Sequence, residues 1–87
     1  MAFATAQAGT LESSDCMVVV TPAGDFILDY RGPNSGIFEE RTRRIAKEIA
    51  DRYAPGSAEV RIQDRGALEI TLHARIETAF QRAVTKA

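Results

Sequence analysis

Two adjacent serines, Ser13 and Ser14, are the residues of this sequence whose types and setting most suggest chemistry. They place two hydroxyl groups side by side between the acids Glu12 and Asp15. An unactivated serine hydroxyl is a weak nucleophile, so it reacts only when a base or a separate enzyme activates it. The same residue types are also ordinary turn formers before a strand, and on spacing alone a plain turn is the simpler interpretation.

The other residue types that could support catalysis are sparse. A hydrolase needs a base beside its nucleophile and a third group that orients the base. His73 is the only histidine, and it falls at the edge of a predicted buried helical stripe, where a packed or surface histidine is the usual interpretation. Glu12 and Asp15 could bind a metal ion, but two carboxylates without further ligands form a poor site. The sequence therefore predicts neither a catalytic nor a metal-binding residue.

A longer pattern around the serines resembles a known family. Gly9–Asp15, followed by Met17 and a short apolar run, resembles the start of the acyl carrier subunit (gamma chain) of bacterial citrate lyase. A second matching block, Asp64–Glu69, continues through Leu72, Ala74, Arg75, Glu77, Arg82 and Ala83. Two separated blocks in the same order are more specific than either alone. The resemblance covers nearly the whole chain and is loosest between residues 22 and 36.

The resemblance assigns a role to one serine. In that family the serine after Gly-Thr-Leu-Glu carries the prosthetic group, which implies covalent attachment at Ser13 through a phosphodiester. The family pattern usually has glycine at the next position, where this chain has Ser14, so Ser14 is the second candidate. The implied cofactor is phosphoribosyl-dephospho-coenzyme A. The serine would be an anchor, and the reactive group would be the thiol of the cofactor.

The resemblance also implies partner proteins. A holo-carrier transferase would attach the cofactor. The citrate lyase alpha subunit, an acyl transferase, would exchange acetyl for citrate, and the beta subunit, a lyase, would cleave the citryl thioester to oxaloacetate. The chain itself would be a non-catalytic carrier with no nucleic-acid or membrane partner. Two alternatives stay open: the carrier subunit of citramalate lyase or malonate decarboxylase, and a cofactor-free interaction module whose serines only form a turn.

Length and composition fit one small cytoplasmic domain. The chain has 87 residues and a net charge of −1, which gives no general attraction to nucleic acid or anionic membranes. Residues 1–30 hold four acids and no base, and all eleven bases lie from Arg31 onward. Cys16 is the only cysteine, which excludes an internal disulfide. No run is long and apolar enough for a membrane span, and Met1–Ala8 lacks the features of a secretory signal.

Short β-branched and alternating runs predict three strands. Residues 1–10 are small and polar, and we expect a flexible tail there, with an acyl carrier domain over residues 11–87. The valine-rich run Cys16–Thr21 and the alternating run Phe26–Tyr30 are expected to pair as an antiparallel hairpin. Ala58–Gln63 alternates apolar with polar residues and is predicted to form the third strand.

Two longer runs predict helices. The first is expected from Ile37 to Tyr53, capped by Asn34 or Ser35 and ended by Pro55-Gly56. The second is expected after Asp64, which stands at a capping position. The predicted buried faces are Phe38, Thr42, Ile45, Ile49 and Tyr53 in the first helix, and Leu68, Leu72, Ile76, Phe80 and Val84 in the second. The expected fold is α+β, with elements in the order β-β-α-β-α. The three strands form one sheet, in which the second and third strands are parallel because the first helix connects them, and both helices pack on one face of the sheet.

Overall fold

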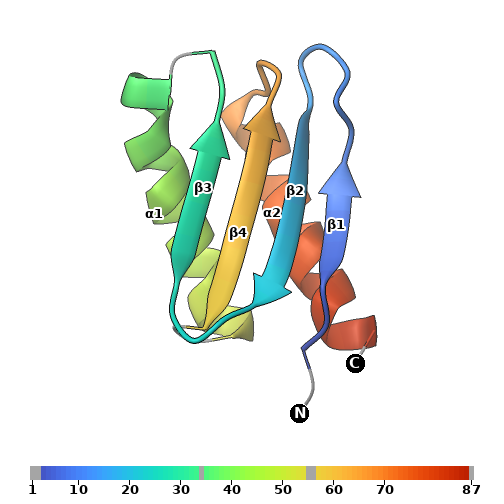
Figure 1. The fold of residues 1–87 in the computed structure, drawn as a ribbon. Coiled ribbons are helices and arrows are strands. Elements are labelled where there is room, and N and C mark those ends of the chain that lie inside the picture. The colour runs from blue at the N-terminus through green and yellow to red at the C-terminus, as the bar shows by residue number, and fades with distance from the viewer. Residues whose placement is uncertain (1–2, 34, 55–56, 87) are drawn as a thin grey trace.

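The chain folds into one sheet with two helices packed on the same face (Figure 1). The computed structural model describes residues 3–33, 35–54 and 57–86. Its elements are β1 (Ala6–Gly9), β2 (Cys16–Pro22), β3 (Ile27–Arg31), α1 (Ser35–Tyr53), β4 (Ala58–Asp64) and α2 (Glu69–Lys86). The α+β class and the placement of both helices on one face are confirmed. Neither helix, within the described residues, has the length and apolar character that crossing a membrane requires.

The sheet has four strands in the order β1-β2-β4-β3, and the prediction of three strands was wrong. The additional strand is β1, which lies within the segment predicted to be a flexible tail. It pairs antiparallel with β2, and its alanines Ala6 and Ala8 are buried beside α2. Alanine has little intrinsic preference for strands, so the local sequence gave no signal. The strand depends on its neighbours: β2 offers an edge for pairing, and α2 covers the small side chains of Ala6 and Ala8.

The predicted hairpin between Cys16–Thr21 and Phe26–Tyr30 was also wrong. In the structure β4 lies between β2 and β3, pairing antiparallel with β2 and parallel with β3. β2 and β4 are both seven residues long and pair over their whole length, whereas β3 has only five residues. The longer pairing therefore satisfies more backbone hydrogen bonds. The parallel connection through α1, predicted from the helix between the two strands, is confirmed.

The core lies between the sheet and the helices. Alternate residues of β2 and β4 point inward, with Val18 paired to Ile62 and Val20 paired to Val60, and all four are buried. The predicted helix faces are largely confirmed, because the following residues are also buried: Thr42, Ile45, Ile49, Leu72, Ile76 and Phe80. Asn34, one of the two predicted caps of α1, and Pro55-Gly56, its predicted end, lie outside the described residues.

The start of α2 differs from the prediction in a way that affects the candidate site. The helix begins at Glu69, and Leu68 is 71% exposed instead of belonging to the buried face. Asp64 is the last residue of β4, and a tight turn separates it from the helix. Gly66 in that turn has a φ of +96°, a conformation that cannot continue into a right-handed helix. Asp64 therefore stabilises a turn and does not cap α2.

Candidate functional site

The two candidate serines lie in the loop that joins β1 to β2. Ser13 and Ser14 are the middle residues of a turn closed by the Asp15 amide, which donates a 3.1 Å hydrogen bond to the Glu12 carbonyl. The side chains of both serines are exposed. Ser13 is the second and Ser14 the third residue of this turn, so both serines lie at its exposed end.

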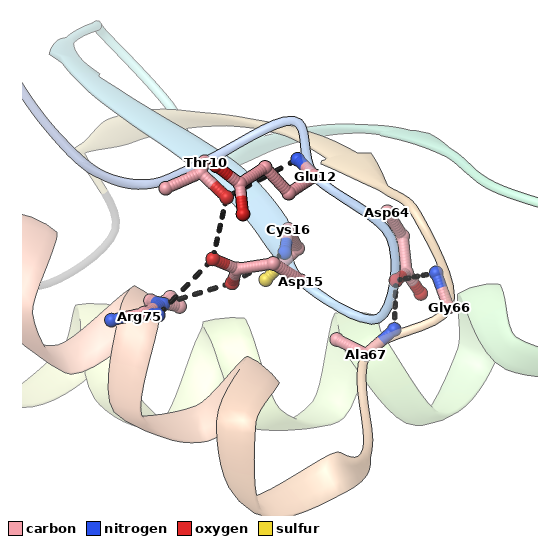
Figure 2. Close-up of polar contacts among 8 residues, drawn as sticks. All are labelled: Thr10, Glu12, Asp15, Cys16, Asp64, Gly66, Ala67 and Arg75. Atoms are coloured by element: carbon pink, nitrogen blue, oxygen red, sulfur yellow. Dashed lines mark hydrogen bonds and ion pairs between the residues drawn. The ribbon is translucent and has the colours of Figure 1, made fainter.

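The carboxylate of Asp15 organises this loop (Figure 2). It accepts hydrogen bonds from the Thr10 hydroxyl at 2.7 Å and from the Cys16 amide at 2.7 Å. Arg75 of α2 approaches both carboxylate oxygens, with Nε at 3.0 Å from Oδ1 and a terminal nitrogen at 3.1 Å from Oδ2. The Thr10 oxygen also accepts the Glu12 amide at 3.2 Å. The loop is thus fastened internally and to a helix 60 residues away in sequence.

A bidentate pair of this kind changes the ionisation of both partners. The hydrogen bonds from Arg75, and then those from Thr10 and the Cys16 amide, hold the pKa of Asp15 well below its usual value of 3.8. The hydrogen bond to Asp15 and its charge raise the pKa of Arg75. The Asp15 side chain is only 13% exposed and that of Arg75 is 41% exposed, so the pair is partly shielded from solvent. Both groups are charged at neutral pH, and the loop between β1 and β2 is held by a charge-assisted contact.

The β4–α2 turn supports the same loop from the other side. The Ser14 amide donates to the Arg65 carbonyl at 2.8 Å, and the Arg65 amide donates to the Asp15 carbonyl at 2.8 Å. These two bonds extend the β2–β4 pairing beyond the strand ends. They hold Ser14 and Asp15, the two residues that follow Ser13, against the backbone of Arg65.

Asp64 shapes that turn. Its Oδ1 accepts hydrogen bonds from the amides of Gly66 at 3.0 Å and Ala67 at 2.8 Å (Figure 2), and its Oδ2 accepts the Tyr30 hydroxyl at 2.5 Å. Burial and the hydrogen bond to Asp64 raise the pKa of Tyr30, so its phenol stays a proton donor. Asp64 is 4% exposed, and these contacts satisfy a buried carboxylate that would otherwise be costly.

The two sequence blocks of the resemblance therefore meet in space. Gly9–Asp15 forms the loop, and Asp64, Arg65 and Arg75 hold it. The sequence predicted a helix start in the second block and missed the supporting role of these residues. The signal that could have indicated this role was the presence of both blocks, because two separated segments that match the same family often contact each other in the fold.

The two serines differ in backbone conformation. Ser14 has a φ of +66°, the only positive φ of a non-glycine residue in the described part of the chain. The third position of a turn with this geometry favours glycine, because a side chain there is strained. This backbone conformation gives a physical reason for the glycine that the family pattern usually has at the position of Ser14. The role of Ser14 in the loop is played by its backbone, which adopts the left-handed conformation and binds Arg65. Ser13 has no such backbone constraint among the contacts described above.

The other reactive groups do not assemble a catalytic site. No group of three or more potential metal ligands occurs among the described residues. His73 is a half-buried helix residue with its Nδ1 3.8 Å from the Glu77 carboxylate on the same helix. Cys16 is completely buried; burial and then the nearby charges of Asp64 and Asp15 raise the pKa of its thiol to about 12. The loop thus presents exposed hydroxyls, and the one thiol of the chain is unreactive.

The Asp15–Arg75 contact predicts a distinct pH dependence of stability. The pKa of Asp15 is lower in the folded chain than in the unfolded chain, so the contact stabilises the fold above pH 3.8 and its contribution is lost progressively as the pH falls below that value. Asp15→Asn should weaken the dependence of the free energy of unfolding on pH below that value. Urea unfolding at several pH values should give a steeper acid loss for the natural chain than for the variant; parallel curves would contradict the role given to Asp15.

Comparison with known proteins finds relatives that match most of the chain. A family model for an acyl carrier protein, described as malonate decarboxylase delta subunit (MdcD), matches residues 4–83. The citrate lyase acyl carrier protein of Treponema denticola is 36% identical over 78 residues, which cover 90% of each chain. That of Streptococcus uberis is 39% identical over 80 residues, covering 91% of this chain and 79% of the relative.

Among solved structures, the fold is similar to a chain in a Pseudomonas malonate decarboxylase hetero-tetramer in complex with malonate. The TM-score is 0.68 at 20% identity, with 92% of this chain and 84% of that chain covered. At this identity the similarity concerns the fold alone. The sequence relatives are close enough, and matched over enough of their length, to settle the family: this chain belongs to the citrate lyase acyl carrier proteins.

Proposed function

We propose that Ser13 carries phosphoribosyl-dephospho-coenzyme A through a phosphodiester, and that the chain presents acyl thioesters on this arm within a citrate lyase complex. The observation that supports the proposal is the exposed position of Ser13 in a turn that is held in place: the Asp15 carboxylate is bound by Thr10 and Arg75, and the backbone of Ser14 and Asp15 is bound by Arg65. A modifying enzyme needs a hydroxyl that projects from the surface, and the carrier body needs to keep its shape around it.

The residues of the loop fit such a group. Ser13 is exposed, and no side chain in the described part of the protein is hydrogen-bonded to its hydroxyl, so we expect loading to depend on a transferase. Asp15 keeps its carboxylate engaged by Arg75, which limits its repulsion of an incoming phosphate. When bound, the prosthetic group supplies a thiol that carries acyl groups as thioesters. The protein contributes an anchor and raises the effective concentration of that thiol at partner sites.

The proposed partners are a holo-carrier transferase and the alpha (acyl transferase) and beta (lyase) subunits of citrate lyase. The names of the sequence relatives support this choice. A second candidate is the carrier of a malonate decarboxylase, which the description of the matching family model favours. Purified partner subunits would separate the two, because a loaded citrate lyase carrier should support turnover of citrate by citrate lyase subunits and should not support turnover of malonate by malonate decarboxylase subunits. A cytoplasmic location is part of the proposal, in keeping with a free cysteine that forms no disulfide.

A thiol count tests the carrier function without the partner subunits. The folded apo protein should react negligibly with a disulfide reagent near neutral pH, because Cys16 is buried and the pKa of its thiol is about 12. The loaded protein should expose one rapidly reacting thiol per chain. Denaturing the apo protein should release one thiol, which serves as the control. A loaded chain, established by intact mass, that shows no rapid thiol would contradict the assignment of a coenzyme A-like arm.

A further inference from the structure

The face of the sheet that the helices leave uncovered contains a hollow of about 370 Å³. Figure 1 shows this face toward the viewer, with α1 and α2 behind the sheet. Side chains of three strands line the hollow: Met17, Val19, Asp29, Arg31, Arg61 and Gln63. It lies on the opposite side of the sheet from the core, because the neighbouring residues Val18, Val20 and Val60 are the ones that point inward and are buried.

The strand register arranges these side chains in two rows. Met17, Gln63 and Arg31 are partners across β2, β4 and β3, and they form the row nearer the attachment loop. Val19, Arg61 and Asp29 form the next row. The β2 side of the hollow is therefore apolar, and the β3–β4 side is polar and charged. Met17 follows Asp15 by two residues, so the hollow begins directly beside the loop that holds Ser13.

The charges in the hollow favour an anion. Arg31 and Arg61 contribute two guanidinium groups and Asp29 one carboxylate. Arg31 uses its Nε to contact Asp29 at 3.3 Å, and a guanidinium has further N–H groups that point elsewhere. Arg31 and Arg61 are the two cations that line the hollow. Guanidinium groups bind phosphate in a bidentate manner, and the adjacent Met17 and Val19 offer a surface for an uncharged part of the same ligand.

From this arrangement we infer that the hollow is a resting site for the phosphate-bearing part of the arm attached to Ser13; the inference rests on the function proposed above. The pyrophosphate of a coenzyme A-like group has the charge that Arg31 and Arg61 complement. Because the arm is tethered beside the hollow, its effective concentration there is high, and the site would be occupied much of the time even if binding is weak. Weak binding also suits a carrier, since the arm must leave the surface to enter a partner active site.

The test compares amide NMR spectra of the apo protein and of the loaded protein in its free-thiol form, which carries phosphates but no acyl carboxylate. Loading should shift the amide signals of Met17, Val19, Arg31, Arg61 and Gln63 in addition to those of the loop. Arg61→Gln should reduce the shifts outside the loop several-fold, and Arg31→Gln should act in the same direction. Arg44→Gln, at an exposed arginine of α1, is the matched control and should leave them unchanged.

Two outcomes would separate this inference from the function it rests on. If intact mass establishes loading and the shifts stay within residues 10–15, the resting site is wrong and the carrier function stands. If the protein cannot be loaded at Ser13, the proposed function itself is wrong. As a further check, dephospho-coenzyme A added to the apo protein should shift the same amides more than inorganic phosphate at equal concentration; equal shifts from both probes would overturn the assignment to the arm.

Discussion

Ser13→Ala is expected to abolish loading of the carrier, while Ser14→Ala and Ser14→Gly are expected to load fully. The reason is positional. Ser13 is exposed at the second position of the turn, whereas Ser14 has a φ of +66° and uses its amide to bind the Arg65 carbonyl. Incubation of each apo variant with the transferase and the cofactor precursor, followed by intact mass spectrometry, measures the loaded fraction directly.

Stability measurements make this comparison interpretable. Ser13→Ala changes an exposed side chain, so the free energy of unfolding should change by less than about 0.5 kcal/mol. Ser14→Gly removes the strain of a serine in the left-handed conformation but increases the entropy of the unfolded chain. Because these effects oppose each other, the free energy of unfolding should stay within about 1 kcal/mol of that of the natural chain. Full loading of a folded Ser13→Ala protein, with the added group on Ser14, would transfer the anchor to Ser14.

Gly9→Ala is expected to have the largest effect on the fold. Gly9 closes the β1–β2 hairpin with a φ of +94°, and a Cβ placed there would lie 1.8 Å from the Cys16 carbonyl oxygen. That atom belongs to the backbone of β2 and cannot move without breaking the strand pairing. Together, the strained backbone and the clash should lower the free energy of unfolding by roughly 3 kcal/mol or more.

A loss of that size is severe for so small a domain, whose whole stability is expected to be on the order of 4 to 13 kcal/mol. Gly24→Ala is the matched control, because a Cβ at Gly24 meets no atom within 4 Å. Urea unfolding should give a much lower midpoint for Gly9→Ala and an unchanged midpoint for Gly24→Ala. Equal midpoints for the two variants would show that the hairpin does not depend on a glycine at its closing position.

Local periodicity predicted the individual elements well. β2 and β4 followed from their β-branched and alternating residues, and α1 followed from its buried face around Ile45 and Ile49. Pairing between strands was predicted poorly, because it depends on competition among distant segments. The four-residue β1 has no pattern of its own and exists because β2 provides an edge, and β4 displaces β3 from the expected hairpin because it pairs with β2 over seven residues.

The candidate site was predicted in the same uneven way. Ser13 was identified through the resemblance and not from any chemical signature, since two serines between two acids also describe a simple turn. The contact of Asp15 with Arg75 joins residues 60 positions apart, and no local pattern predicts it. Asp64 was expected to cap a helix because carboxylates often do so; the left-handed Gly66 instead ends the strand with a turn, and the carboxylate stabilises that turn.

Peptide mapping of the protein isolated from its own cells, within the active assembly, is the most direct test of the carrier account. The peptide that contains Ser13 should be heavier than its sequence mass by one phosphoribosyl-dephospho-coenzyme A group, and fragmentation should locate that mass on Ser13. An active assembly in which Ser13 and Ser14 are both unmodified would contradict the account.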